Sequence, residues 1–267
     1  TTMTDIHSIS LALDPTNTPS FLLDWEITKK CNLNCSYCTT GIDGGHDNSY
    51  SHPKLEECLA TIDFMYRYAD IYMQHKRSSQ RKVVLNVYGG ESLYHPDIVA
   101  ILQACRDKYK EYKNRWYLTI ICTTNGIVSE KQFARIIPLI DNFTVSYHSE
   151  NTLDQKDTFR RNVTALKTHA KPFRVVVMMN NKSEYWQDCF DAIDFLKENN
   201  IDYTPKPLDN EGQEYTYDHD QFGQLKTFWL KKANTLFNQE YSNLLESTGN
   251  SEKICAIEQG RPCCGNR

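Results

Sequence analysis

The sequence predicts an α/β protein in which a parallel sheet is covered by helices. Six short apolar stretches, each bounded by turn residues, follow one another between residues 22 and 205. Between them, apolar residues recur at three- and four-residue steps, as in amphipathic helices. Strict alternation of strands and helices calls for a parallel sheet with right-handed crossovers. Two architectures fit this pattern: an open doubly wound sheet and an incomplete (β/α)6 barrel of the TIM type.

The predicted strands are rich in β-branched and aromatic residues. They cover residues 22–28, 83–88, 117–123, 143–147, 173–179 and 201–205. In both architectures the functional residues gather where parallel strands end. The residues that follow each predicted strand are therefore the candidates for a functional site.

The predicted helices begin at residues that favour helix N-termini. Ser51 precedes Pro53 and an apolar pattern, which predicts an N-cap and a proline in the first turn. Ser129 and Gln132 have the spacing of a capping box. Further helices are predicted from residue 95 on, over residues 159–166 and over residues 183–196.

Three segments follow from this reading of the chain. Residues 1–20 precede the first predicted strand, residues 21–207 contain the alternating strands and helices, and residues 208–267 form a C-terminal extension. The extension begins with a polar linker, continues with an apolar helical pattern and carries three cysteines near its end. We therefore expect one α/β unit with a helical, cysteine-bearing C-terminal extension.

Charge and hydropathy argue against several classes of function. The 267 residues include 30 Lys and Arg against 34 Asp and Glu, a net charge of -4, so a nucleic-acid partner is not indicated. No apolar run reaches the roughly 18 residues of a membrane span, and the N-terminus lacks the features of a signal peptide. We expect a cytoplasmic protein, where clustered cysteines bind metal or do redox chemistry more often than they form disulfides.

Three of the ten cysteines follow the first predicted strand directly. Cys31, Cys35 and Cys38 are spaced C-x3-C-x2-C on one short loop. Thiolates at this spacing can converge on one iron–sulfur cube, and the lack of a fourth leaves one iron open to a small molecule. The alternative is a zinc site completed by His46 or another residue. Four other cysteines fall in predicted helices or strands and are expected to be buried apolar residues: Cys58, Cys105, Cys122 and Cys189.

The second predicted strand ends in Gly89, Gly90 and Glu91. Two glycines directly after a buried strand permit close approach of the backbone to a ligand. An ordinary turn at the end of a strand explains the same pair equally well.

The cysteine loop, Tyr37 before its third cysteine and the Gly-Gly-Glu sequence after the second strand resemble the radical S-adenosylmethionine (SAM) superfamily. The resemblance covers about residues 20–207. It implies a partial (β/α)6 barrel with a [4Fe-4S] cluster that binds SAM at its open iron. It also implies reductive cleavage of SAM to methionine and a 5'-deoxyadenosyl radical, with a ferredoxin or flavodoxin as reductant.

The resemblance implies site roles where residues match. The three cysteines would ligate the cluster, Tyr37 would lie beside the adenine, and Gly89, Gly90 and Glu91 would line the methionine moiety. Asn125 lies in a turn that is similar to one common in this superfamily. Ser146 matches a position that often contacts the ribose or carboxylate of SAM.

Polar residues after the later strands are candidates for contacts with a substrate. His148 could donate or accept a proton, and Tyr147 could give a hydrogen atom or an electron to a substrate radical. Lys206 could pair with a carboxylate of SAM or of the substrate. A histidine that satisfies local hydrogen bonds and a surface lysine are the alternatives.

The C-terminal Cys255, Cys263 and Cys264 resemble the opening of a SPASM or twitch extension, which holds an auxiliary iron–sulfur cluster in many relatives that modify peptides. Three explanations stay open. The sequence stops within a longer extension, the cysteines bind a second cluster with an open iron, or they form a cysteine-rich tail.

Together these expectations describe a radical SAM enzyme that abstracts hydrogen from a peptide or protein, with a crosslink, an epimerisation or an oxidation as the outcome. One alternative keeps the chemistry and replaces the substrate by a nucleoside, a tRNA base or a small metabolite. Another is an iron–sulfur electron-transfer or binding protein that does not cleave SAM. The Gly-Gly-Glu sequence argues against it, because such a protein needs no methionine-binding turn.

Overall fold

The computed structural model describes residues 8–13, 19–38, 48–74, 81–208 and 217–227, with side chains from residue 21 on. The chain divides into two compact units, residues 1–213 and residues 214–267. In the second unit, residues 219–227 are helical. The predicted linker lies mostly outside the described residues, and Cys255, Cys263 and Cys264 lie outside them altogether.

The first unit contains a seven-stranded sheet whose strands lie in the order of the chain. The strands are β1 (Ser8–Leu13), β2 (Pro19–Thr28), β3 (Lys82–Gly89), β4 (Tyr117–Thr124), β5 (Asn142–His148), β6 (Phe173–Met179) and β7 (Tyr203–Pro207). From β2 to β7 all neighbours are parallel, and β1 pairs antiparallel with β2. A doubly wound sheet reverses its strand order, so the sequential order identifies a partial (β/α)6 barrel, which is not closed.

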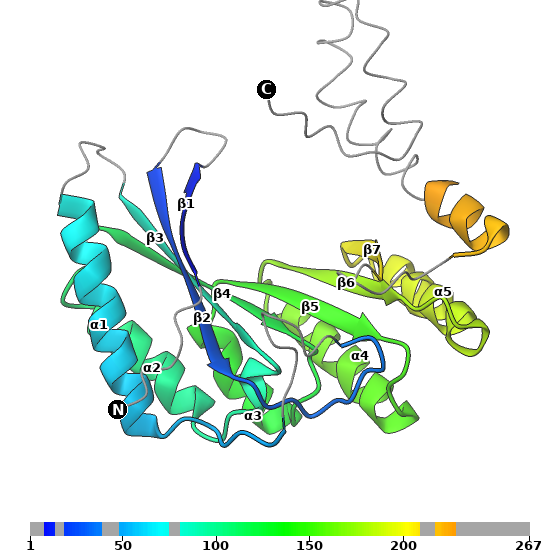
Figure 1. The fold of residues 1–267 in the computed structure, drawn as a ribbon, viewed down its shortest axis with the longest axis horizontal. Coiled ribbons are helices and arrows are strands. Elements are labelled where there is room, and N and C mark those ends of the chain that lie inside the picture. Colours follow the sequence, from blue (N-terminus) through cyan, green and yellow to red (C-terminus); the bar gives the residue numbers. More distant parts are fainter. Residues whose placement is uncertain (1–7, 14–18, 39–47, 75–80, 209–216, 228–267) are drawn as a thin grey trace, which may run out of the picture. The chain divides into compact units, whose positions relative to one another are not determined.

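Five helices lie along one face of this curved sheet (Figure 1). They are α1 (Leu55–Gln74), α2 (Ile98–Tyr109), α3 (Glu130–Ile136), α4 (Leu153–Thr168) and α5 (Ser183–Glu198), with short 3-10 turns at Ser92–Tyr94 and Ile137–Leu139. Every second strand residue is buried, as at Val83, Leu85 and Val87 of β3. These side chains form the core with the apolar stripes of the helices, and the alternate residues occupy the other face of the sheet.

The start of α1 differs from the prediction. The helix begins at Leu55, and the backbone N–H of Lys54 donates to Glu57 Oε2 at 2.8 Å, so Lys54 and not Ser51 occupies the capping position. Pro53 precedes the helix, and its carbonyl accepts a hydrogen bond from His95 Nε2. Tertiary contact with the segment after β3 therefore fixes these residues outside the helix.

The edges of the sheet also differ from the prediction. β1 lies within the segment expected to precede the barrel, although Ile9, Leu11 and Leu13 alternate with smaller residues as a strand requires. β7 begins two residues late, because Ile201 completes the end of α5 through a bond from its N–H to the carbonyl of Leu196. The capping box of Thr152 and Gln155 and the N-cap Ser129 show that local helix signals otherwise act as in isolated helices.

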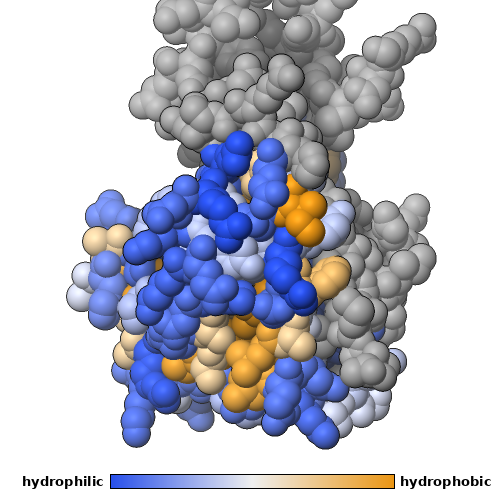
Figure 2. Space-filling model, turned by 90° about the vertical axis from the view of Figure 1, so that its left-hand side faces the viewer, coloured by the Kyte–Doolittle hydropathy of each residue, from blue (hydrophilic) through white to orange (hydrophobic). Residues whose placement is uncertain are grey.

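The face that Figure 2 shows is mainly hydrophilic, with a group of apolar side chains exposed on it. α1, at the left of Figure 1, exposes Leu59, Phe64 and Ile71. The rings of Phe64 and Tyr68 stack on each other, which shields part of this apolar area. Among the described residues, no helix is long and apolar enough to cross a membrane.

The buried cysteines give the fold a measurable dependence on pH. Cys58, Cys105, Cys122 and Cys189 are all buried, as expected. Burial raises the pKa of the Cys122 thiol from 9.0 to about 12. Above pH 9 the unfolded chain loses this proton while the folded chain keeps it, so the free energy of unfolding falls by up to about 1.4 kcal/mol per pH unit from this thiol.

We therefore expect the stability of a Cys122→Ala variant to decline less steeply between pH 9 and pH 10.5 than that of the unaltered protein. Urea unfolding of both cluster-free proteins at intervals over this range measures the two slopes. Because all other titrating groups are shared, parallel slopes would contradict the assignment of this pH dependence to Cys122.

Candidate functional site

The loop that follows β2 carries Cys31, Cys35 and Cys38, all half-buried and free of disulfides. A bond from the N–H of Cys38 to the carbonyl of Cys35 closes a turn that brings the second and third cysteines together. Burial, with a smaller contribution from neighbouring charges, raises the pKa of the Cys31 thiol to about 11 and that of the Cys35 thiol to about 12. The charge of Cys38 acts on both Cys31 and Cys35, which indicates that the third thiol lies near the other two.

The donor set fits an iron–sulfur cube better than a single metal ion. Among the described residues, no three His, Cys, Asp or Glu side chains are grouped so that they could hold one ion. The ligands of a cube bind at its separate corners, so three thiolates on one loop can each ligate a different iron and leave the fourth iron open. His46, the candidate for a fourth zinc ligand, lies outside the described residues.

A network of amides and a carboxylate fixes the first cysteine of the loop. Asn125 Nδ2 donates to Asn32 Oδ1 at 2.7 Å and lies 3.9 Å from Cys31 Sγ, and Asn32 Nδ2 donates to the carbonyl of Ile127. Buried Glu91 accepts bonds from the N–H groups of Asn125 and Leu93 and from the Thr124 hydroxyl. Burial raises the pKa of Glu91, while these bonds act in the opposite direction. Its carboxylate thus joins the ends of β3 and β4 beneath the loop.

The two glycines after β3 allow the backbone of the cysteine loop to approach closely. The N–H of Gly90 donates to the carbonyl of Thr28, and the N–H of Glu91 donates to the carbonyl of Lys30, both at 2.8 Å. A Cβ at Gly89 would collide with the carbonyl oxygen of Thr28, and the φ angle of 155° there disfavours other residues. These contacts join two segments of the chain, and the close approach to a ligand stays a prediction.

The end of β5 holds the other side of the loop. Tyr37 is buried, and its hydroxyl lies 2.7 Å from His148 Nδ1, which is also 3.5 Å from Cys35 Sγ. Burial lowers the pKa of His148 to about 4 and raises that of Tyr37. At neutral pH both side chains are therefore uncharged, and a hydrogen bond links the Tyr37 hydroxyl and His148 Nδ1.

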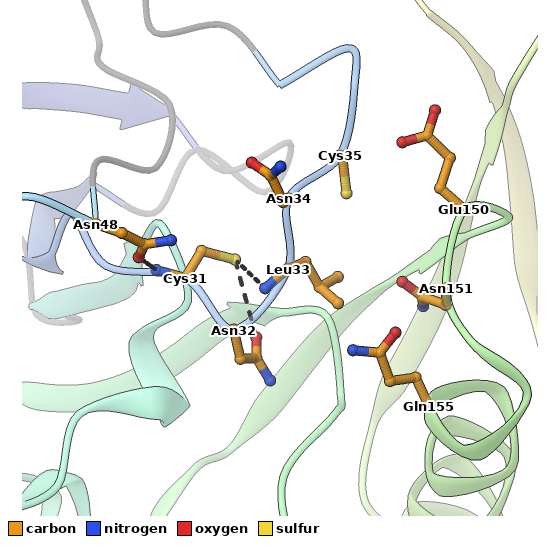
Figure 3. Close-up of a pocket in the computed structure, with 9 residues that line it drawn as sticks. All are labelled: Cys31, Asn32, Leu33, Asn34, Cys35, Asn48, Glu150, Asn151 and Gln155. Atoms are coloured by element: carbon orange, nitrogen blue, oxygen red, sulfur yellow. Dashed lines mark hydrogen bonds between the residues drawn. The ribbon is translucent and has the colours of Figure 1, made fainter.

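A cavity of about 350 Å³ adjoins the loop. Cys31 and Cys35 line it on one side, and Glu150, Asn151 and Gln155 line it from the β5–α4 turn and the start of α4 (Figure 3). Asn32, Asn34 and Asn48 complete a wall rich in amides. Space for a bound group is thus present directly beside two of the thiols.

The remaining candidates are not all brought to this site. Ser146 lies on the same face of β5 as His148, and strand register places Lys206 of β7 level with His148, two strands away, where its side chain is exposed. Tyr147 points to the helix side of the sheet, where its hydroxyl donates to Asp188 Oδ2 of α5 at 2.7 Å. The structure therefore does not bring Tyr147 to the cysteine loop.

Several residues that hold the loop were not singled out from the sequence. Asn32 and Ser36 lie between the cysteines, and Asn180 and Lys182 follow β6. Asn32 and Ser36 could have been found from their place within the cysteine loop. Asn180 and Lys182 could have been found from their place directly after a strand. Nothing in the sequence indicated which of them pair.

Comparison with known proteins agrees with this geometry. The family model described as the radical SAM superfamily matches residues 25–206. Among solved structures, native anSMEcpe with bound AdoMet is similar at a TM-score of 0.54 and 14% identity, covering 85% of this chain and 62% of that one. Native anSMEcpe with bound AdoMet and Cp18Cys peptide is similar at a TM-score of 0.54 and 14% identity, covering 85% of this chain and 61% of that one. This chain thus spans about three fifths of their length, and no curated protein matches it in sequence.

Proposed function

The chain belongs to the radical SAM superfamily, and from this premise we propose that it cleaves SAM at a [4Fe-4S] cluster on Cys31, Cys35 and Cys38 and abstracts hydrogen from a peptide or protein. The arrangement of the three half-buried thiols on one loop directly after β2 carries this proposal. When bound, the cluster would supply the electron for reductive cleavage of SAM, the chemistry that precedes hydrogen abstraction from the substrate.

The chain's own residues prepare the thiols for the cluster. Because burial keeps Cys31 and Cys35 protonated in the cluster-free protein, loading displaces their protons. The N–H of Leu33 donates to Cys31 Sγ at 3.4 Å, and the Asn125 amide lies near the same sulfur. Such donors stabilise a ligating thiolate.

We assign the SAM contacts to residues that surround the loop. The backbone at Gly89 and Gly90 would line the methionine moiety, and Glu91 would fix that turn through its bonds to β4. Tyr37 would lie beside the adenine. Ser146, on the same strand face as His148, would reach the ribose, and Lys206 would pair with a carboxylate of SAM or substrate. Asn125 would act mainly through Asn32 and Cys31.

His148 is the candidate for proton transfer, through Nε2, the ring nitrogen other than the one that Tyr37 contacts. Two features support a peptide or protein substrate: the similarity of the fold to that of a structure that holds a Cp18Cys peptide, and the C-terminal cysteines. A ferredoxin or flavodoxin would supply the electron, as radical SAM enzymes need a reductant.

The test is anaerobic incubation of the reconstituted protein with SAM and dithionite, with 5'-deoxyadenosine measured by mass spectrometry. We expect the nucleoside well above a control without protein. A library of peptides deuterated at Cα and Cβ then tests the substrate class, because hydrogen abstraction transfers deuterium to 5'-deoxyadenosine. A protein with a full cluster that forms no nucleoside, with or without peptides, would favour the electron-transfer alternative.

A further inference from the structure

We propose that Glu150 is a positioning residue that fixes the segment between the second and third cluster cysteines. This inference rests on the proposed function, because it concerns the same cysteine loop. Glu150 follows β5 directly and lies 114 residues from Ser36 in the sequence, yet the two residues are joined by two hydrogen bonds.

The carboxylate of Glu150 accepts from both polar groups of Ser36. The backbone N–H of Ser36 donates to Oε2 at 2.6 Å, and the Ser36 hydroxyl donates to Oε1 at 2.5 Å. Hydrogen bonds to an ionised acceptor are short and about twice as strong as neutral ones. The pair therefore fixes both the backbone and the side chain of the residue between Cys35 and Tyr37.

Residues after β6 hold Glu150 itself in place. Asn180 Nδ2 donates to Oε1 at 2.9 Å, and Asn180 is buried. Lys182 Nζ donates to the Ser36 hydroxyl at 3.0 Å and lies 3.8 Å from Oε1. Because Lys182 is half exposed, its ion pair adds little, and the carboxylate and the buried amide do most of the fixing.

A shift of Ser36 would move two cluster ligands at once. Cys35 precedes it, and the turn closed by the bond from the Cys38 N–H to the Cys35 carbonyl contains it. The opposite end of the loop is held separately, through Asn32 and Asn125. Loss of Glu150 would therefore loosen the second and third ligands while leaving the first in place. Residues that orient metal ligands in this way change metal affinity about 10- to 100-fold when they are replaced.

The experiment compares Glu150→Ala and Glu150→Asp with the unaltered protein after anaerobic reconstitution. A chelator is added, and cluster release is followed by loss of visible absorbance. We expect release to be about 10- to 100-fold faster in both variants. Glu150→Asp is informative because it keeps the charge but is too short to reach Ser36 and Asn180 together. The EPR spectrum of the reduced cluster with SAM supplies a second readout, and we expect a changed line shape.

Glu184→Ala is the matched control. Glu184 follows β6 much as Glu150 follows β5. It lies in the first turn of α5, where its carboxylate accepts a bond from the hydroxyl of the neighbouring Ser183. It should release the cluster at the rate of the unaltered protein, and thermal melting confirms that all variants fold.

The outcomes separate the two proposals. If the unaltered protein takes up no cluster, the proposed function and this inference both fail. If it loads a cluster and both Glu150 variants release it at the unaltered rate with an unaltered spectrum, only the inference fails. If Glu150→Asp behaves like the unaltered protein while Glu150→Ala does not, the charge and not the position of Glu150 matters, and the inference is overturned.

Discussion

Cys35→Ala protein should form 5'-deoxyadenosine only at the level of a control without protein, while its barrel stays folded. Cys35 is one of three thiols available to the cluster, and two thiolates do not replace three at separate corners of a cube. The side chain is half-buried on a loop and makes no part of the apolar core. Its removal therefore eliminates a ligand without opening a core cavity.

Three measurements check this expectation: 5'-deoxyadenosine by mass spectrometry, iron per chain, and thermal melting by circular dichroism. Cys58→Ala is the matched control, because it makes the same substitution at a buried cysteine of α1. That variant should lose some stability and keep its cluster and its activity. Cleavage of SAM by Cys35→Ala at the rate of the Cys58→Ala control would contradict the assignment of the cluster ligands.

Periodicity was sufficient to predict a parallel sheet covered by helices, because each strand and each helix carries its own pattern. The choice of a partial barrel over a doubly wound sheet came from the resemblance, and the sequential strand order confirms it. The apolar residues of β3 and β6 alternate or run together, and the caps of α3 and α4 lie within four residues of the groups that they bind. Information of this kind is local in the sequence. The predicted start of α1 was wrong because it depends on a contact that is distant in the sequence. His95, which lies 42 residues further along, binds the carbonyl of Pro53 and holds this residue outside the helix.

The cysteine motif predicted the cluster ligands, but the contacts that hold the loop come from distant strand ends. Asn32 meets Asn125 across 93 residues, and Ser36 meets Glu150 across 114. A single sequence shows that polar residues follow each strand, and it does not show which of them pair. These contacts required the structure.

The sequence also contained the signal that places Tyr147 away from the candidate site. Phe143 and Val145 are apolar and two residues apart, and Tyr147 continues their phase. Successive strand residues point to opposite faces, so this phase assigns Tyr147 to the helix side and His148 to the other face. The structure agrees, since Tyr147 binds Asp188 of α5 and His148 contacts Tyr37 of the loop.

The second large effect is expected from Gly90→Ala. A Cβ at this position would lie 2.5 Å from the carbonyl oxygen of Lys29 and 2.6 Å from that of Lys30. Both obstacles are backbone atoms at the entrance to the cysteine loop, so no side chain can rotate away to make room. The backbone bond from Gly90 to Thr28 and that from Glu91 to Lys30 would have to lengthen.

We therefore expect Gly90→Ala to lose about 1–3 kcal/mol of stability, to load less iron and to lose most of its SAM cleavage. Gly223→Ala is the matched control, because nothing lies within 4 Å of a Cβ built there and alanine favours the helix that contains it. Urea unfolding, iron content and 5'-deoxyadenosine formation compare the two variants. A Gly90→Ala protein that matched Gly223→Ala in all three would mean that the loop tolerates displacement of its entrance. In that case the tight backbone contact between β2 and the end of β3 would not be what positions Cys31.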